Sequence, residues 1–170
     1  MEDILISRES ISEKVKELGA IITKDYEGKN LVVIGVLKGS FIFMADLVRE
    51  IRLPIVVDFI AAKSYVGTET TGEVKIVKDI NVDVAGKDVL IVEDIIDSGF
   101  TLSKLKEYFA GKSAASVKIC TALDKPERRK VKNLKVDYVG FSIPDEFVIG
   151  YGLDYDDNFR NTYDVRIYKP

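Results

Sequence analysis

The sequence predicts an α/β fold built on a parallel sheet. Two unbroken apolar runs, residues 31–37 and 89–92, fit strands that are covered on both faces, as the strands of a parallel sheet are. Each run leads through a short polar turn into apolar residues at helical spacing, which after the second run are Leu102, Leu105 and Phe109. The chain has 170 residues, of which 46% are apolar and 31% charged, so we expect one soluble domain over residues 1–170.

In chain order, the first element expected is an amino-terminal helix. Ser10 and Glu13 form a capping-box pattern, and helical spacing follows at Ile11, Val15, Leu18 and Ile22. The strand at 31–37 passes through the turn 38–40 into a largely apolar helix at 41–51. Further strands are expected at 55–62, 74–80, 116–123 and 138–143, followed by an apolar segment at 147–153 and a short strand near 165–168. Residues 64–73 should form a mobile loop, and Gly111 should end the helix that begins at Thr101.

Composition and charge argue against several classes of function. The net charge is −3, and the densest basic cluster, residues 125–132, contains Glu127, so a broad nucleic-acid-binding face is disfavoured. The chain starts with an acidic segment and has no apolar run approaching about 18 residues, so we expect no secretion signal, no membrane span and a cytoplasmic location. Without histidine, and with a single cysteine in an apolar run, zinc sites, histidine triads and disulfide scaffolds are disfavoured, and Cys120 is interpreted as a buried core residue.

The most informative segment is the junction that follows the second apolar run. The loop expected at 94–99 joins the carboxyl end of a strand to the amino end of a helix, where open α/β sheets bind ligands. The first amides of that helix, together with Ser98, Gly99 and the hydroxyl of Thr101, can cradle a phosphate. Glu93 and Asp94 would repel the same phosphate, so they should face ribose hydroxyls or a hydrated Mg²⁺.

The same junction has other interpretations. Two acids at the end of an apolar strand also occur where they merely cap a turn. A P-loop is excluded because Lys106 stands where the glycine before Gly111-Lys112-Ser113 is required. A dinucleotide fingerprint is excluded because Tyr155 occupies the third glycine position after Gly150 and Gly152.

Five motifs, in this order, resemble the phosphoribosyltransferases of purine salvage, specifically the hypoxanthine-guanine type. They are Leu-Lys-Gly-Ser at 37–40, Lys-Ser-Tyr at 63–65, the acidic junction at 93–102, Leu-Asp-Lys-Pro-Glu-Arg-Arg at 123–129 and Phe-Val-Ile-Gly-Tyr-Gly-Leu-Asp-Tyr at 147–155. The resemblance covers roughly residues 31–160. It implies the type I phosphoribosyltransferase fold: a parallel sheet of about five strands flanked by helices, with a small hood and a flexible active-site loop. It also implies 5-phosphoribosyl-1-pyrophosphate and Mg²⁺, a 6-oxopurine acceptor, IMP or GMP and pyrophosphate as products, and a homodimer or homotetramer.

Residue by residue, the resemblance first assigns the sugar-phosphate site. The 5′-phosphate falls to Asp97, Ser98, Gly99, Phe100 and Thr101, mostly through backbone amides. The ribose hydroxyls and a metal ion fall to Glu93 and Asp94. Asp97 would also lie near purine N7 and act as the general base, a role that contributes about 10²–10⁴ in rate. The alternative for Asp97 is a turn-capping aspartate at the start of the helix.

The resemblance also assigns the leaving group, a lid and the purine. Pyrophosphate would be held by Leu37, Lys38, Gly39 and Arg160, often with a cis peptide between Leu37 and Lys38. Ser64 and Tyr65 would stand at the base of a lid. For the purine, the residues are Lys125, Phe147, Val148 and Asp154. The Lys125 ammonium is only a donor and would select a base with an acceptor at position 6, Phe147 would stack on the ring, Val148 would offer its carbonyl, and Asp154 would reach a second Mg²⁺.

Without the resemblance, each of these residues has an ordinary structural interpretation. Lys125 and Asp154 could be charges at loop ends, Phe147 and Val148 could be strand core, and an isolated arginine such as Arg160 is usually a solvated surface residue. At the level of function, two alternatives stay open: a xanthine-preferring transferase, and a non-catalytic regulator of the same fold that binds nucleic acid in response to metabolites.

Overall fold

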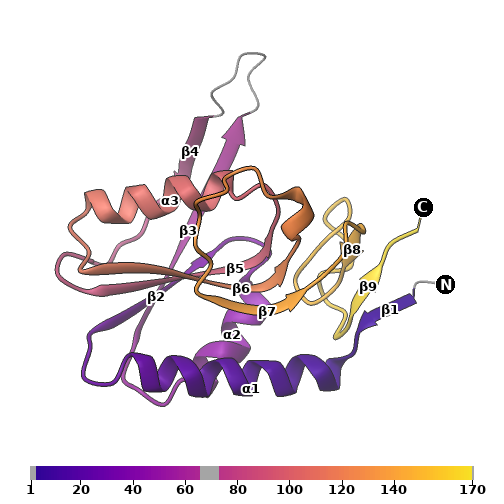
Figure 1. Cartoon of the computed structure of the whole chain (residues 1–170), viewed down its shortest axis with the longest axis horizontal. Coiled ribbons are helices and arrows are strands. Elements are labelled where there is room, and N and C mark those ends of the chain that lie inside the picture. The colour runs from indigo at the N-terminus through magenta and orange to yellow at the C-terminus, as the bar shows by residue number, and fades with distance from the viewer. Residues whose placement is uncertain (1–2, 66–72, 170) are drawn as a thin grey trace.

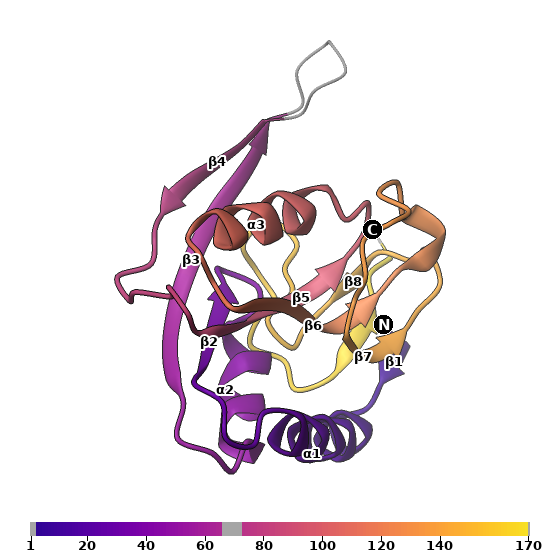
Figure 2. The ribbon, with the colours of Figure 1, turned by 60° about the vertical axis from the view of Figure 1, so that its left-hand side comes forward.

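A six-stranded sheet forms the centre of the computed structural model, which describes residues 3–65 and 73–169. The strands, in spatial order, are β4 (Glu73–Lys78), β3 (Val56–Tyr65), β2 (Leu31–Val36), β5 (Asp88–Ile96), β6 (Ser116–Asp124) and β7 (Tyr138–Ser142) (Figure 1). Five of them run parallel, as predicted, and β4 pairs antiparallel with β3 at one edge. The β3–β4 ribbon extends beyond the body of the sheet (Figure 2).

Helices cover both faces of this sheet. Helices α1 (Arg8–Asp25) and α2 (Phe41–Glu50) pack on one face and α3 (Phe100–Gly111) on the other (Figures 1 and 2). Because successive strand residues point to opposite faces, β2 serves both layers: Val33 belongs to the core beneath α1 and α2, and Ile34 to the core beneath α3. All six residues of β2 are buried, which confirms the prediction of a strand covered on both sides.

The predicted capping box at the first helix is wrong in its position. Helix α1 begins at Arg8, and Ser7 is its N-cap, with extended backbone and a side-chain oxygen that accepts the amide of Ser10 at 3.2 Å. Ser10 lies inside the first turn, so it cannot cap. The buried stripe of α1 is the predicted one, namely Ile11, Val15, Leu18 and Ile22.

Strand β5 is longer than its apolar run indicates. Glu93, Ile95 and Ile96 remain paired with β6, so the predicted loop at 94–99 is wrong in its first half and only Asp97–Gly99 connect β5 to α3. The acidic residues Glu93 and Asp94 do not end the strand. A backbone can continue its ladder while its side chains change from apolar to acidic.

The predicted loop at 64–73 also begins too early and ends too late. Ser64 pairs with Val74, and Tyr65 with Glu73, so these residues continue the β3–β4 ribbon. Residues 66–72 lie outside the described part of the chain. The helix after β5 ends at Gly111, as predicted, and the remaining predicted helices and strands are present with slightly different ends.

A second, three-stranded antiparallel sheet forms the hood. Its order is β1 (Asp3–Ile6), β9 (Val165–Ile167), β8 (Val148–Ile149), so the two ends of the chain lie side by side (Figure 1). Strand β1 was not predicted, because four residues at an acidic terminus carry too little periodicity. The apolar segment at 147–153 contributes only two strand residues, since Gly150 and Gly152 take positive φ and reverse the chain.

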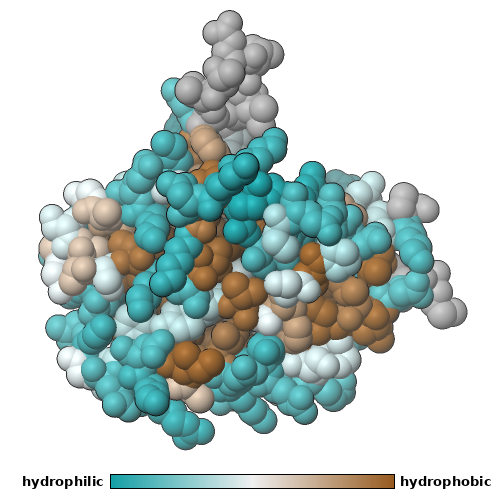
Figure 3. All heavy atoms as spheres, in the orientation of Figure 1, coloured by the Kyte–Doolittle hydropathy of each residue, from teal (hydrophilic) through white to brown (hydrophobic). Residues whose placement is uncertain are grey.

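The described surface is largely polar on the face shown in Figure 3, and apolar residues gather on the right, over the hood. None of the helices within residues 3–65 and 73–169 is long and apolar enough to span a bilayer. Cys120 is fully buried in β6, and burial raises the pKa of its thiol, so the prediction of a core cysteine is confirmed.

Asp58 ties the β3–β4 edge to the chain that leads into β5. Although burial opposes its ionisation, its carboxylate accepts backbone amides from Phe59 at 2.7 Å, Asn81 at 2.7 Å and Val82 at 3.1 Å. These bonds outweigh burial and lower the pKa of Asp58 below its ordinary value.

Candidate active site

A cavity of about 420 Å³ opens at the carboxyl ends of β2 and β5. This is the edge at which a parallel sheet brings strand-end loops together. Every residue predicted to bind ribose phosphate or pyrophosphate lines it, together with the predicted metal ligand Asp154: Leu37, Lys38, Gly39, Glu93, Asp94, Asp97, Ser98, Gly99, Phe100, Thr101, Asp154 and Arg160. Residues distant in the sequence therefore converge on one cavity.

The loop between β5 and α3 has the form of an anion cup. Gly99 is the N-cap of α3 at φ +82°, and a Cβ at this position would come within 2.9 Å of Leu134 and 3.1 Å of Arg129. Gly99 has no side chain with which to cap the helix, so the first turn can receive an anion. The carbonyl of Ser98 accepts two backbone amides, each at 3.0 Å, from Lys130 and Val131, which hold the loop from behind.

Glu93 and Asp94 form a close acidic pair at the end of β5. Burial, and for Glu93 also the neighbouring charge of Asp94, raises the pKa of both carboxyls. A Cβ on Gly39 would overlap the carboxylate of Asp94, so only glycine permits this approach of the turn after β2. A pair that is costly to ionise on its own suits a partner that supplies positive charge or hydroxyl donors, such as a cation or a ribose.

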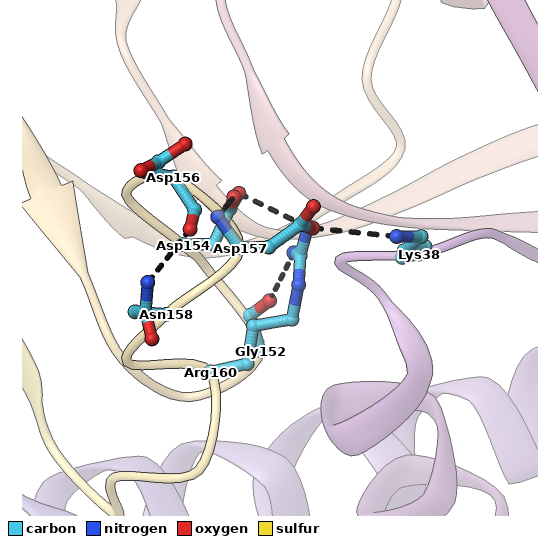
Figure 4. Close-up of polar contacts among 7 residues, drawn as sticks. All are labelled: Lys38, Gly152, Asp154, Asp156, Asp157, Asn158 and Arg160. Carbon is cyan, nitrogen blue, oxygen red and sulfur yellow. Dashed lines mark hydrogen bonds and ion pairs between the residues drawn. The ribbon is translucent and has the colours of Figure 1, made fainter.

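One side of the cavity is a polar network between the hood and the turn after β2 (Figure 4). Arg160 donates to the carbonyl of Gly152 at 2.8 Å and pairs with Asp154 at 3.1 Å and Asp157 at 3.4 Å. Lys38 pairs with Asp157 at 3.3 Å. The Leu37–Lys38 peptide is cis, the geometry often found in the family that the motifs resemble.

Of the four predicted purine residues, Asp154 lines this cavity, whereas Lys125, Phe147 and Val148 do not. Lys125 follows β6, and its amide donates to the carbonyl of Ile96 at 3.0 Å, which places it beside the start of the phosphate loop. Its side chain is buried, and within residues 3–65 and 73–169 no carboxylate pairs with its ammonium. Phe147 is 52% exposed and Val148 is buried in β8. An exposed ring can accept a flat ligand, and a buried, unpaired ammonium can accept a carbonyl oxygen.

The ring of Phe147 is held by aromatic neighbours. Its centroid lies 5.7 Å from that of Tyr155 and 5.9 Å from that of Tyr168, both edge-on, and the two tyrosines stack at 4.3 Å. Sequence reasoning missed Tyr168, because one aromatic residue in a short terminal segment carries no local signal.

Of the two predicted lid residues, Ser64 does not line the cavity, although it sits on the adjoining ribbon. Ser64 is exposed near the end of β3, and Tyr65 is the last residue of that strand. Ala62 of the same strand is the β3 residue that lines the cavity. The lid expected from Ser64 and Tyr65 depends on residues 66–72, outside the described part of the chain.

Arg129 is a further residue that sequence reasoning missed. Its guanidinium pairs with Asp124, and its Nε donates to the backbone carbonyl of Asp97 at 3.1 Å. It therefore links the end of β6 to the phosphate loop. In the sequence, Arg129 stands out only by its place in the motif at 123–129. That place does not distinguish an arginine that anchors a loop from one that is an exposed surface charge.

A larger cleft, of about 530 Å³, lies between α1, α2 and the hood. Two of its charged groups already pair with each other, since Asp46 accepts from Arg49, and also from Tyr151, at 2.7 Å each. The start of α1 borders this cleft, but the amides of Arg8 and Ser10 there already donate to Asp164 and Ser7. The smaller cavity, where the glycine N-cap of α3 supplies no side-chain cap, is the better candidate for chemistry on a charged substrate.

Comparison with known proteins agrees with this choice. A family model described as Phosphoribosyl transferase domain matches residues 5–156. The chain is 52% identical to the hypoxanthine-guanine phosphoribosyltransferase of Lactococcus lactis subsp. lactis (strain IL1403), covering 100% of this chain and 92% of that protein. It is 51% identical to the protein of the same name from Bacillus subtilis (strain 168), covering 100% and 94%. A crystal structure of a hypoxanthine phosphoribosyltransferase from Staphylococcus aureus matches with a TM-score of 0.95 at 48% identity, covering 99% of this chain and 91% of that one.

Proposed function

The chain belongs to the phosphoribosyltransferase family, and from this premise we propose that it transfers the 5-phosphoribosyl group of 5-phosphoribosyl-1-pyrophosphate to hypoxanthine, guanine or both. The products are IMP or GMP and pyrophosphate, so the enzyme serves purine salvage. Relatives of about half identity over the whole chain carry the hypoxanthine-guanine name, which favours this activity over a xanthine-preferring transferase or a non-catalytic regulator.

One observation carries the proposal: a phosphate cup, an acidic pair and a cationic network line a single cavity, with Lys125 beside it. A phosphoribosyl pyrophosphate has a phosphate at one end, a diol in the middle and a pyrophosphate at the other. The phosphate cup, the acidic pair and the cationic network match these three parts in charge and in hydrogen-bonding groups. The position of Lys125 lets the acceptor base lie next to the sugar.

The reaction replaces pyrophosphate at ribose C1 by a purine nitrogen. In a loose transition state, positive charge grows on the ribose and negative charge on the departing pyrophosphate. Glu93 and Asp94 would stabilise the first, and Lys38, Arg160 and the amides of the turn after β2 would stabilise the second. Because these groups are already placed before substrate arrives, little reorganisation accompanies the reaction.

Asp97 is the residue we propose as general base. Its side chain is exposed at the cavity, and no donor within residues 3–65 and 73–169 binds its carboxylate. It is therefore free to take or share the proton at purine N7 as the new bond to C1 forms.

Mg²⁺ fits the carboxylates of the cavity. Among the described residues, no group of three or more acidic, histidine or cysteine side chains is placed to hold a metal. Mg²⁺ usually binds through one or two carboxylates, several waters and substrate phosphates. Glu93 and Asp94 on one side of the cavity and Asp154 on the other are carboxylates of the type that such a site requires. Bound there with substrate, the ion would neutralise charge on the pyrophosphate.

Specificity for the base is proposed to come from Lys125 and Phe147. The Lys125 ammonium is buried, and within residues 3–65 and 73–169 no carboxylate pairs with it. It is therefore stabilised by a base that offers a hydrogen-bond acceptor at position 6. Adenine places an amino group, a donor, at this position, so the ammonium would lack an acceptor. Phe147 would stack on the ring, and the carbonyl of Val148 would contact its edge.

The test is a competition assay with purified protein, Mg²⁺ and 5-phosphoribosyl-1-pyrophosphate. We expect hypoxanthine or guanine to be converted to its nucleotide in preference to xanthine and adenine. Asp97→Asn should lower kcat by about 10²–10⁴ while substrate binding is retained. Equal losses of turnover and binding would contradict the base role, and no conversion of any purine would contradict the proposed function.

A further inference from the structure

We propose that Asp157 is an internal counter-ion that occupies Lys38 and Arg160 until pyrophosphate displaces it. The inference rests on the proposed function, which gives those two cations to the leaving group. It adds a residue that competes with the substrate's pyrophosphate and helps to set how tightly substrate and product are held.

The geometry is that of one acceptor shared by two donors. A single oxygen of Asp157, Oδ1, lies 3.3 Å from Nζ of Lys38 and 3.4 Å from Nη2 of Arg160 (Figure 4). A phosphate oxygen between the same two cations would need both of these donors. The carboxylate and a pyrophosphate oxygen therefore compete for this position between the two cations.

The turn that presents Asp157 has a defined conformation. Asp156 and Asp157 both take left-handed backbone conformations, at φ +51° and +59°, which non-glycine residues adopt only at a free-energy cost. Two backbone bonds between Tyr155 and Asn158, at 3.0 and 3.1 Å, close the turn, and the amide of Asp157 donates to Asp154 at 2.9 Å. The backbone position of Asp157, from which its carboxylate can reach the two cations, is thus set by this turn.

The exposure of the three side chains explains why displacement is easy. The side chains of Asp157 and Lys38 are 74% and 70% exposed, whereas that of Arg160 is 21% exposed. Asp157 can turn into water without leaving a buried charge, and Arg160 keeps its bonds to Gly152 and Asp154 when Asp157 leaves. Pyrophosphate brings more charge and more oxygens than one carboxylate, so it wins the competition.

The consequence for turnover concerns both ends of the reaction. Before binding, the counter-ion holds two like charges near one point and limits their repulsion. After the transfer, the same carboxylate competes for the cations and favours departure of pyrophosphate. Asp157 therefore lowers affinity for the diphosphate and leaves the purine side of the site unaffected.

The test is direct binding of pyrophosphate at fixed Mg²⁺ by titration calorimetry, with Asp157→Asn compared to Asp156→Asn. The control removes the same charge from the neighbouring residue of the same turn, where Asp156 contributes its backbone carbonyl to Asn158. Asparagine tolerates left-handed backbone, so both variants should fold, and thermal unfolding checks this. We expect Asp157→Asn to bind pyrophosphate roughly two- to tenfold more tightly, and Asp156→Asn to change affinity by less than about twofold.

Kinetics supply a second readout. In Asp157→Asn the KM for 5-phosphoribosyl-1-pyrophosphate should fall and the KM for the purine should stay the same, with a smaller difference at high salt. Unchanged or weaker pyrophosphate binding in Asp157→Asn, or an equal gain in Asp156→Asn, would overturn the counter-ion role while the wild-type activity stands. Failure of the wild-type protein to bind pyrophosphate would overturn the proposed function as well.

Discussion

Replacing Arg129 by methionine should destabilise the protein and weaken its phosphate site. Arg129 pairs with Asp124, and the two side chains are only 16% and 12% exposed. Methionine keeps most of the length and apolar volume of the arginine's aliphatic side chain. It removes the charge and the hydrogen bond from Arg129 Nε to the carbonyl of Asp97. The variant leaves the Asp124 carboxylate buried without its partner.

The size of the effect follows from that burial. Removing one member of a buried ion pair costs about 3–5 kcal/mol, and some exposure of both side chains favours the lower end, so we expect about 3 kcal/mol for Arg129→Met. Asp124→Asn should cost about 2 kcal/mol, because it leaves a partly solvated guanidinium. The double variant leaves no uncompensated charge, so its cost should fall short of the sum by about 2 kcal/mol.

The assay is urea unfolding at fixed protein concentration, followed by far-ultraviolet circular dichroism. If the costs of the two single variants simply add, the pair is not coupled and the reasoning is refuted. Loss of the bond to Asp97, at about 1 kcal/mol, should also raise the KM for 5-phosphoribosyl-1-pyrophosphate about fivefold in Arg129→Met. An unchanged KM would show that the loop is held without Arg129.

Three other changes test the site and the fold. Gly39→Ala would force its Cβ into the carboxylate of Asp94, so kcat/KM should fall by about 100-fold; a steady-state assay showing near-normal activity would contradict the close approach. Asp58→Asn should cost about 2 kcal/mol at pH 7. Because the folded-state pKa of Asp58 is lowered, its stabilisation is present above its ordinary pKa of 3.8 and lost as pH falls through the lowered value, so the gap between variant and wild type in thermal unfolding should close in acid. Tyr168→Ala should raise the KM for the purine about threefold through looser placement of Phe147, with the KM for 5-phosphoribosyl-1-pyrophosphate unchanged and Tyr168→Phe near normal; equal shifts in both KM values would argue against this role.

Much of the site could be predicted because its chemistry is local. The residues from Glu93 to Thr101 follow one another along the chain, and their order alone places acids at a strand end and small residues at a helix start. The predictions failed where two local patterns compete. Ser7 and Ser10 both suit an N-cap, and the polarity of Glu93 hides the continuation of β5.

The sequence by itself determined the kinds of most elements, the buried stripes of α1 and α3 and the strand-end groups that carry charge, because these depend on spacing over a few residues. Only the tertiary structure decided which distant groups meet. Lys38 and Asp157 are 119 positions apart, and Arg129 reaches the loop at Asp97 from the segment that follows β6. Such pairs leave no periodic trace in the chain, since their contact depends on how the hood and the strand ends pack around one cavity.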